Sequence, residues 1–143
     1  MKLKDKVTLI TGGGRGIGKA VALAYAREGA KVAICARTAS EIDQTVGEIR
    51  ALKADCGGWT CDVSLEESVK QLIANVKQEF GRIDVVVNNA GVMTRPVPIT
   101  ELEVKKWDYT IAVNLRGSFL VAQAVMPIMM KQKSGAIINV SSA

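Results

Sequence analysis

The chain alternates short apolar runs with longer amphipathic stretches. A short apolar run predicts a buried strand, and apolar residues spaced three or four positions apart predict a helix. Five runs predict strands at 6–10, 31–36, 59–61, 83–87 and 136–140. Helical spacing follows over 17–29, 40–52, 69–80 and from about 105 toward 133. Strands that alternate with helices are typical of a doubly wound α/β fold, a parallel sheet covered on both faces.

Polar residues predict where two of these helices begin. Ser64 and Glu67 have the spacing of a capping box before the third helix, and Thr100 and Glu103 have it before the long fourth helix. In such a box the hydroxyl and the carboxylate bind backbone N–H groups that the helix leaves unpaired.

A glycine-rich run, Thr-Gly-Gly-Gly-Arg-Gly-Ile-Gly at 11–18, joins the first strand to the first helix. A helix N-terminus has unpaired N–H groups and a partial positive charge, and glycines allow close approach, so this turn predicts a pyrophosphate site. Gly12, Gly16 and Gly18 are spaced G-x-x-x-G-x-G, which differs from the dinucleotide fingerprint G-x-G-x-x-G. A tight turn without a ligand is the alternative interpretation.

Polar residues also follow the other predicted strands. Arg37 follows the second strand, Asp62 the third, Asn-Asn-Ala-Gly at 88–91 the fourth, and the serines at 141–142 the fifth. The carboxyl ends of parallel strands share one edge of the sheet, which is where α/β proteins bind ligands. Each residue has a structural alternative, such as a cap at Asp62 or turn amides at the asparagines. Their common edge favours one ligand site.

Composition excludes several function classes. A chain of 143 residues predicts a single domain over 1–143. There is no histidine, and the three cysteines form no C-x-x-C pair, so neither a metal site nor a disulfide framework is expected. The net charge of +5 comes from scattered basic residues, which does not predict a nucleic-acid partner. No apolar run of about 18 residues and no signal region is present, so we expect a cytoplasmic protein without a membrane partner.

Taken together, the motifs resemble those of the short-chain dehydrogenase/reductase family, in particular 3-oxoacyl-carrier-protein reductases. The resemblance rests on TGGGRGIG at 11–18, Asp62-Val63, NNAG at 88–91, Asn114 within VNLRG, and NVSS at 139–142. It implies a Rossmann fold, hydride transfer between NADP(H) and a carbonyl or alcohol substrate, and a homodimer or homotetramer.

The resemblance also implies roles for individual residues. The cofactor would be bound by Gly12, Arg15, Gly16, Ile17, Gly18, Arg37, Asp62, Val63, Asn89, Ala90 and Gly91. Ser142 matches the catalytic serine that donates to the substrate carbonyl, and Asn114 matches the residue that holds a proton-relay water. An acidic residue after the second strand would bind the ribose of NAD, but Ala36 and Arg37 stand there. Arg37, with Arg15, therefore predicts NADP(H).

The chain departs from the family pattern after Ser142. The expected Tyr-x-x-x-Lys motif is not in the sequence, because Tyr25 is followed four positions later by Gly29 and Tyr109 by Val113. The fifth strand would also be left as an exposed apolar edge. We therefore expect an N-terminal portion of a longer enzyme, inactive alone. The alternatives are a dinucleotide-binding module without catalysis and an α/β domain without a ligand.

Overall fold

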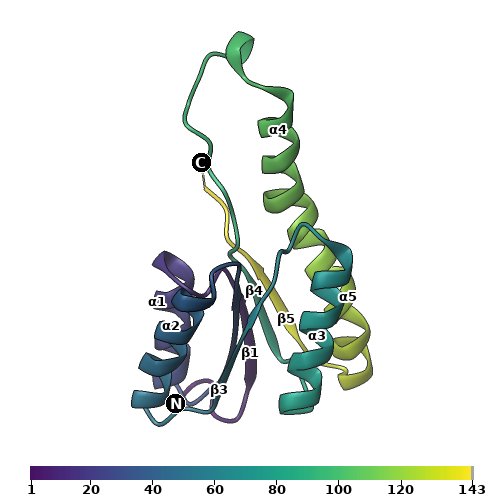
Figure 1. Ribbon diagram of the computed structural model, residues 1–143. Coiled ribbons are helices and arrows are strands. Elements are labelled where there is room, and N and C mark those ends of the chain that lie inside the picture. Colours follow the sequence, from purple (N-terminus) through teal and green to yellow (C-terminus); the bar gives the residue numbers. More distant parts are fainter. Residues whose placement is uncertain (143) are drawn as a thin grey trace.

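In the computed structural model, which describes residues 1–142, a parallel five-stranded sheet lies between two layers of helices (Figure 1). The strands are β1 (Val7–Thr11), β2 (Lys31–Ala36), β3 (Cys56–Thr60), β4 (Val85–Asn88) and β5 (Ala136–Asn139). The helices are α1 (Gly16–Arg27), α2 (Ala39–Ala51), α3 (Glu66–Phe80), α4 (Val104–Ile111) and α5 (Gly117–Gln132), with a 3-10 turn η1 (Ile99–Glu101) and a π-helical segment η2 (Ala112–Arg116). The strand order is β3-β2-β1-β4-β5, so the predicted doubly wound fold is confirmed.

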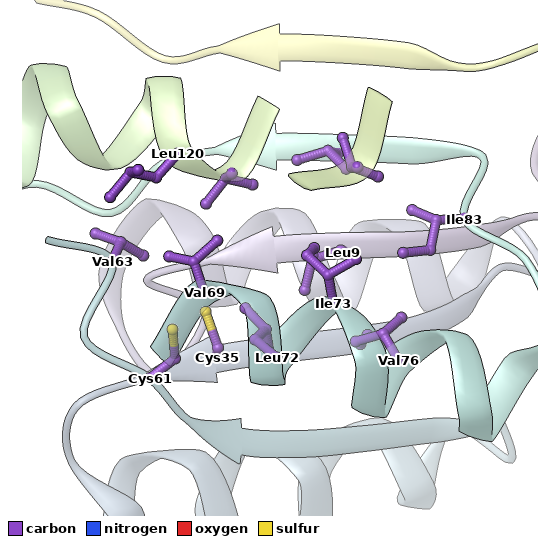
Figure 2. Close-up of a cluster of buried hydrophobic side chains, with 14 of the residues drawn as sticks. Leu9, Cys35, Cys61, Val63, Val69, Leu72, Ile73, Val76, Ile83 and Leu120 are labelled. Atoms are coloured by element: carbon purple, nitrogen blue, oxygen red, sulfur yellow. The ribbon is translucent and has the colours of Figure 1, made fainter. Parts of the chain in front are cut away.

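The sheet separates two apolar cores. Figure 1 shows α1 and α2 on one face and α3 and α5 on the other. Successive residues of a strand point to opposite faces, so Leu9 belongs to the α3 and α5 side and Ile10 to the α1 and α2 side. Figure 2 shows Leu9 beside Ile73 of α3. Both strand residues are fully buried, which explains why β1 is apolar at adjacent positions.

The third strand is longer than predicted. It begins at Cys56 and contains Gly57 and Gly58, which we expected to precede it. A Cβ at Gly58 would overlap the side chain of Ile42 and lie 2.9 Å from that of Val46. Glycine is therefore present because α2 packs closely on β3, and this packing outweighs the low strand propensity of glycine.

Neither predicted capping box forms. Helix α3 begins after Leu65, and the hydroxyl of Ser64 instead donates to Oδ1 of Asp62 at 2.6 Å. Helix α4 begins after Glu103, whose side chain makes no capping hydrogen bond within the described chain, and Thr100 lies in η1. The Ser64 hydroxyl thus bonds to a nearby side chain and not to a backbone N–H group at the start of the helix, as a capping box would require.

The expectation that no segment is long and apolar enough to span a membrane needs correction. α4, η2 and α5 form one helical segment of 29 residues, Val104–Gln132, that passes this test by length and composition. A membrane is not needed to explain its apolar residues, because Leu120, Val121 and Val125 are buried against the sheet and α3. Core helices and membrane helices share such a composition.

Asp84 ties the start of β4 to β1. Its buried carboxylate accepts hydrogen bonds from the Val7 N–H at 2.9 Å and from Nε and Nη2 of Arg82 at 2.9 and 2.6 Å. Burial raises the pKa of Asp84, but the hydrogen bonds from Arg82 and Val7 outweigh it, so the net pKa lies below its usual value.

Asp84→Ala is expected to lower the free energy of unfolding by about 2 kcal/mol at neutral pH, because the Val7 N–H and Arg82 lose their acceptor. A carboxyl group with a depressed pKa stabilises the fold above its unfolded pKa of about 3.9, and this contribution is lost as the pH falls through the folded pKa. Urea titrations at pH 7 and at about pH 3 should therefore show a smaller deficit at the lower pH. Asp43→Ala, at an exposed position of α2, is the control. An equal deficit at both pH values would contradict this account.

Candidate functional site

A cavity of about 310 Å³ lies at the carboxyl edge of the sheet. It is lined by the glycine turn after β1, the end of β2, the segment after β3, the segment after β4 and one residue of η2. The lining residues are Gly12, Gly14, Arg15, Gly16, Ile17, Cys35, Ala36, Arg37, Thr38, Glu41, Cys61, Asp62, Val63, Asn89, Ala90, Gly91, Val92 and Val113. The polar ends of four strands therefore meet around one hollow.

All of the residues predicted for cofactor binding line this cavity except Gly18. Eight lining residues lie outside the predicted set: Gly14, Cys35, Ala36, Thr38, Glu41, Cys61, Val92 and Val113. Of these, Glu41 and Val113 lie inside helical segments, where the end of a strand gives no signal. No local motif marks Glu41. Val113 has one usable signal, its position next to Asn114.

The glycine turn requires glycine for two separate reasons. Gly12 and Gly16 adopt left-handed backbone conformations, with φ of 66° and 55°. Gly18 lies against the turn itself, and a Cβ there would overlap the carbonyl oxygen of Gly12 and lie 2.5 Å from Nδ2 of Asn89. The first turn of α1 is thus packed directly on the loop that precedes it.

The N-terminus of α1 borders the cavity without a side-chain cap. Its N-cap residue, Arg15, makes no capping hydrogen bond to any group of residues 1–142. A Cβ at Gly16 would meet no other segment of the described chain within 4 Å, so there is open space beside the first residue of the helix. Open space beside uncapped N–H groups fits a phosphate, because these groups supply donors and a partial positive charge.

Asn89 and Thr11 hold the glycine turn against the end of β4. The amide Nδ2 of Asn89 donates to the carbonyl oxygens of Thr11 and Gly12 at 3.1 and 3.2 Å. In return, Oγ1 of Thr11 accepts the N–H groups of Asn89 and Ala90 at 3.1 and 3.0 Å. Asn89 thereby shapes the cavity, and its predicted contact with the cofactor remains a prediction.

Two arginines border the cavity, and each already has a partner. Nη1 of Arg15 lies 3.8 Å from Oε1 of Glu41, in an exposed ion pair. Arg37 donates from Nη1 to the hydroxyl of Tyr109, and its guanidinium lies 5.8 Å from the centre of that ring. Two arginines therefore lie near the end of β2, and two acidic side chains, Glu41 and Asp62, are also among the lining residues.

Asp62 lies in a turn and also lines the cavity, while its predicted role in cofactor binding stays a prediction. Its Oδ1 accepts from both the N–H and the hydroxyl of Ser64, at 3.0 and 2.6 Å, as in a turn. It also lines the cavity beside Val63. A Cβ at Gly117 would lie 2.8 Å from the side chain of Val63, so glycine lets the start of α5 approach this wall.

Asn114 lies in the π-helical segment η2, and its side-chain amide makes two hydrogen bonds with one backbone unit. Its Oδ1 accepts the Val92 N–H at 2.7 Å, and its Nδ2 donates to the Val92 carbonyl at 2.8 Å. These bonds hold the segment after β4 against the helix. A π segment widens the helix locally and is often found at functional sites.

The two residues predicted to be catalytic do not line the cavity. Asn114 is bonded to the lining residue Val92, and Ser142 is exposed beyond the end of β5. Ser142 lies at the carboxyl edge because β5 pairs in parallel with β4 from Ala136 to Asn139, and Asn114 is near that edge through its bonds to Val92. The structure thus brings the cofactor set together at one wall and leaves Ser142 at its margin.

Comparisons with known proteins agree with this geometry. A family profile described as short chain dehydrogenase matches residues 6–143. The chain is 42% identical over 142 residues to a 3-oxoacyl-(acyl-carrier-protein) reductase of Thermotoga maritima, covering 99% of this chain and 57% of that protein. The chain therefore spans little more than half the length of this relative.

Two solved structures are similar to the whole chain. A metagenomic short-chain oxidoreductase in complex with NADP has a TM-score of 0.95 and 36% identity, covering 100% of this chain and 65% of that one. An NAD⁺-bound xylitol dehydrogenase has a TM-score of 0.97 and 32% identity, covering 99% and 55%. The same fold thus carries either nicotinamide dinucleotide in these two proteins.

Proposed function

Because this chain belongs to the short chain dehydrogenase family, we propose that it binds NADP(H) and serves hydride transfer between that cofactor and a carbonyl or alcohol substrate. The observation that carries the proposal is the cavity at the carboxyl edge, where an uncapped helix N-terminus and two arginines face one hollow. Anions are favoured at such a place by both the helix N–H groups and the arginine charges.

We place the pyrophosphate at the glycine turn. Gly12 and Gly16 have no side chains that would obstruct the pyrophosphate. The first N–H groups of α1, including that of Ile17, would supply the hydrogen-bond donors. Gly18 has an indirect role, because it allows the turn to pack against α1. The bound nicotinamide would supply or accept the hydride.

We assign the 2′-phosphate of NADP(H) to Arg37 and Arg15. Ala36 leaves no carboxylate to bind a free 2′-hydroxyl at the end of β2. Glu41 pairs with Arg15, so the phosphate would compete with this carboxylate for the guanidinium. The adenine would lie along Asp62 and Val63, with Asn89, Ala90 and Gly91 closing the opposite wall.

We assign the carbonyl oxygen of the substrate to the hydroxyl of Ser142, which would donate a hydrogen bond to the charge that develops there. Asn114 would hold a water molecule for proton transfer. Its side chain already makes two hydrogen bonds with Val92, so a water would take the second N–H of Nδ2 or the second lone pair of Oδ1. A positioning role for Asn114, holding the segment after β4, needs no such water.

We expect a small carbonyl or alcohol substrate and a cytoplasmic homo-oligomer. Two similar proteins are named a 3-oxoacyl-(acyl-carrier-protein) reductase and a xylitol dehydrogenase, names that indicate reduction of a carbonyl and oxidation of an alcohol. Trp107, Leu115, Phe119 and Met130 are exposed along α4, η2 and α5, and they supply an apolar surface for a second copy.

The cofactor assignment predicts a switch in preference. Ala36→Asp combined with Arg37→Ile is expected to weaken NADPH binding by about ten- to a hundredfold and to favour NADH, because one or two charge-assisted bonds are lost and a ribose acceptor is gained. Fluorescence titrations with both cofactors check this, with Arg50→Ile at an exposed position of α2 as the control. Equal affinity of the unmutated protein for NADPH and NADH would refute the assignment.

A further inference from the structure

Two cysteines border the cavity and have no part in the proposed function. Cys35 lies in β2 and Cys61 directly after β3, and both are free cysteines within the described residues. Cys35 pairs in register with Trp59, so Cys61, two residues later, lies on the same face of the sheet. Figure 2 shows the two sulfurs side by side on the α3 side.

The surroundings of Cys61 favour its thiolate. The hydroxyl of Ser68 donates to its sulfur at 3.4 Å, and Ser68 belongs to the first turn of α3, where the helix carries a partial positive charge. The hydrogen bond from the Cys35 thiol lowers the pKa of Cys61 to about 7, with help from Ser68 and against the opposing effects of burial and of the Asp62 carboxylate. The adjacent Cys61 sulfur and burial raise the pKa of Cys35, so Cys35 remains the protonated donor.

Cys56 provides an internal comparison. It lies at the start of β3, is half-buried, and donates to the Val46 carbonyl at 3.7 Å. Burial raises the pKa of this thiol. Cys56 is also absent from the lining of the cavity. Cys61 thus lies on the cavity wall in surroundings that stabilise its thiolate, whereas Cys56 lies away from the cavity in surroundings that do not.

We propose that Cys61 is a covalent modification site for small, uncharged α,β-unsaturated carbonyl compounds, and that its adduct and the nucleotide exclude each other from the cavity. The thiolate sulfur adds to the β-carbon, and the displaced π electrons take up a proton from water at the α-carbon. The thiol proton has gone to water beforehand, so the net change is addition of S–H across the C=C bond, without oxidation or reduction.

The adduct and the nucleotide would exclude each other because Cys61 lies on the wall of the cavity. It directly precedes Asp62 and Val63, to which we assign the adenine, so this half of the proposal rests on the proposed function. Cys61 is only 5% exposed and reaches solvent by way of the cavity that it lines. A bound nucleotide would block that route, and an adduct would occupy space that the adenine needs.

Acrylamide labelling of the natural full-length protein tests the site, with adducts at Cys61 and Cys56 quantified by peptide mass spectrometry. We expect Cys61 to react at least about tenfold faster than Cys56 at neutral pH, with a rate that rises through an apparent pKa near 7. Saturating NADPH should slow Cys61 at least about tenfold and leave Cys56 unchanged. Ser68→Ala should shift the Cys61 rate profile to higher pH, because the thiolate loses a donor.

Calorimetric titration of the labelled protein with NADPH tests exclusion. We expect labelling to abolish binding in the parent and in Cys56→Ser, and to leave the affinity of Cys61→Ser the same before and after treatment. Labelling of Cys61 no faster than Cys56, labelling that NADPH does not slow, or a labelled parent that binds NADPH normally would overturn the proposal. An unlabelled parent that binds no NADPH would instead refute the proposed function, and with it the exclusion half of this inference.

Discussion

Replacing Gly18 with alanine is expected to weaken NADPH binding by at least about 100-fold, which corresponds to about 2.7 kcal/mol. The added Cβ would overlap the carbonyl oxygen of Gly12 and crowd Nδ2 of Asn89, which itself donates to Gly12 at 3.2 Å. Backbone occupies this space, so the strain cannot be relieved by a rotamer change. The glycine turn has to move away from α1, and the pyrophosphate site is lost.

Gly47→Ala is the matched control for this experiment. Gly47 lies in α2 at an exposed position, and a Cβ there would meet no described atom within 4 Å. Alanine should stabilise the helix by up to about 1 kcal/mol and leave NADPH affinity unchanged. Circular dichroism establishes that both variants fold. A folded Gly18→Ala protein that binds NADPH as the parent does would show that the turn is not the phosphate site.

Ser142→Ala is expected to reduce kcat of the natural full-length protein by at least about 100-fold, the scale of a lost donor to a developing oxyanion. The affinity for NADPH should change little, because Ser142 is exposed beyond β5 and does not line the cavity. Steady-state kinetics with a 3-oxoacyl thioester, together with a binding titration, separate the two quantities.

Ser141→Ala, at the adjacent exposed position, is the control for that variant and should retain kcat within about twofold. A parallel loss of kcat and of NADPH affinity in Ser142→Ala would indicate a structural serine. An unchanged kcat would remove Ser142 from the reaction altogether.

The fold could be predicted because its signals are local and repeated. Val85, Val86 and Val87 form an apolar run that only a strand covered on both faces explains, and Figure 1 shows helices on both faces. The glycine run at 11–18 and Arg37 marked the cavity for a similar reason. Each follows a strand directly, so a parallel sheet brings them to one edge.

Other features depend on contacts between distant segments. The bonds from Asn89 to Thr11 join residues 78 positions apart, and neither local sequence predicts them. Glycine occurs at position 58 of β3 because α2 packs closely on it, against the low strand propensity of glycine. The π segment contains Asn114, which bonds to Val92 in the segment after β4, and a helical periodicity gives no sign of such a segment.

The central claim is that the cavity at the carboxyl edge holds a nicotinamide dinucleotide with a 2′-phosphate. Calorimetric titration of the natural full-length protein with NADPH and with NADH tests it most directly. The account predicts one saturable site per chain, with NADPH bound at least about tenfold more tightly than NADH because Arg37 and Arg15 meet the added phosphate. The absence of saturable binding for both nucleotides, or an affinity for NADH equal to or greater than that for NADPH, would contradict it.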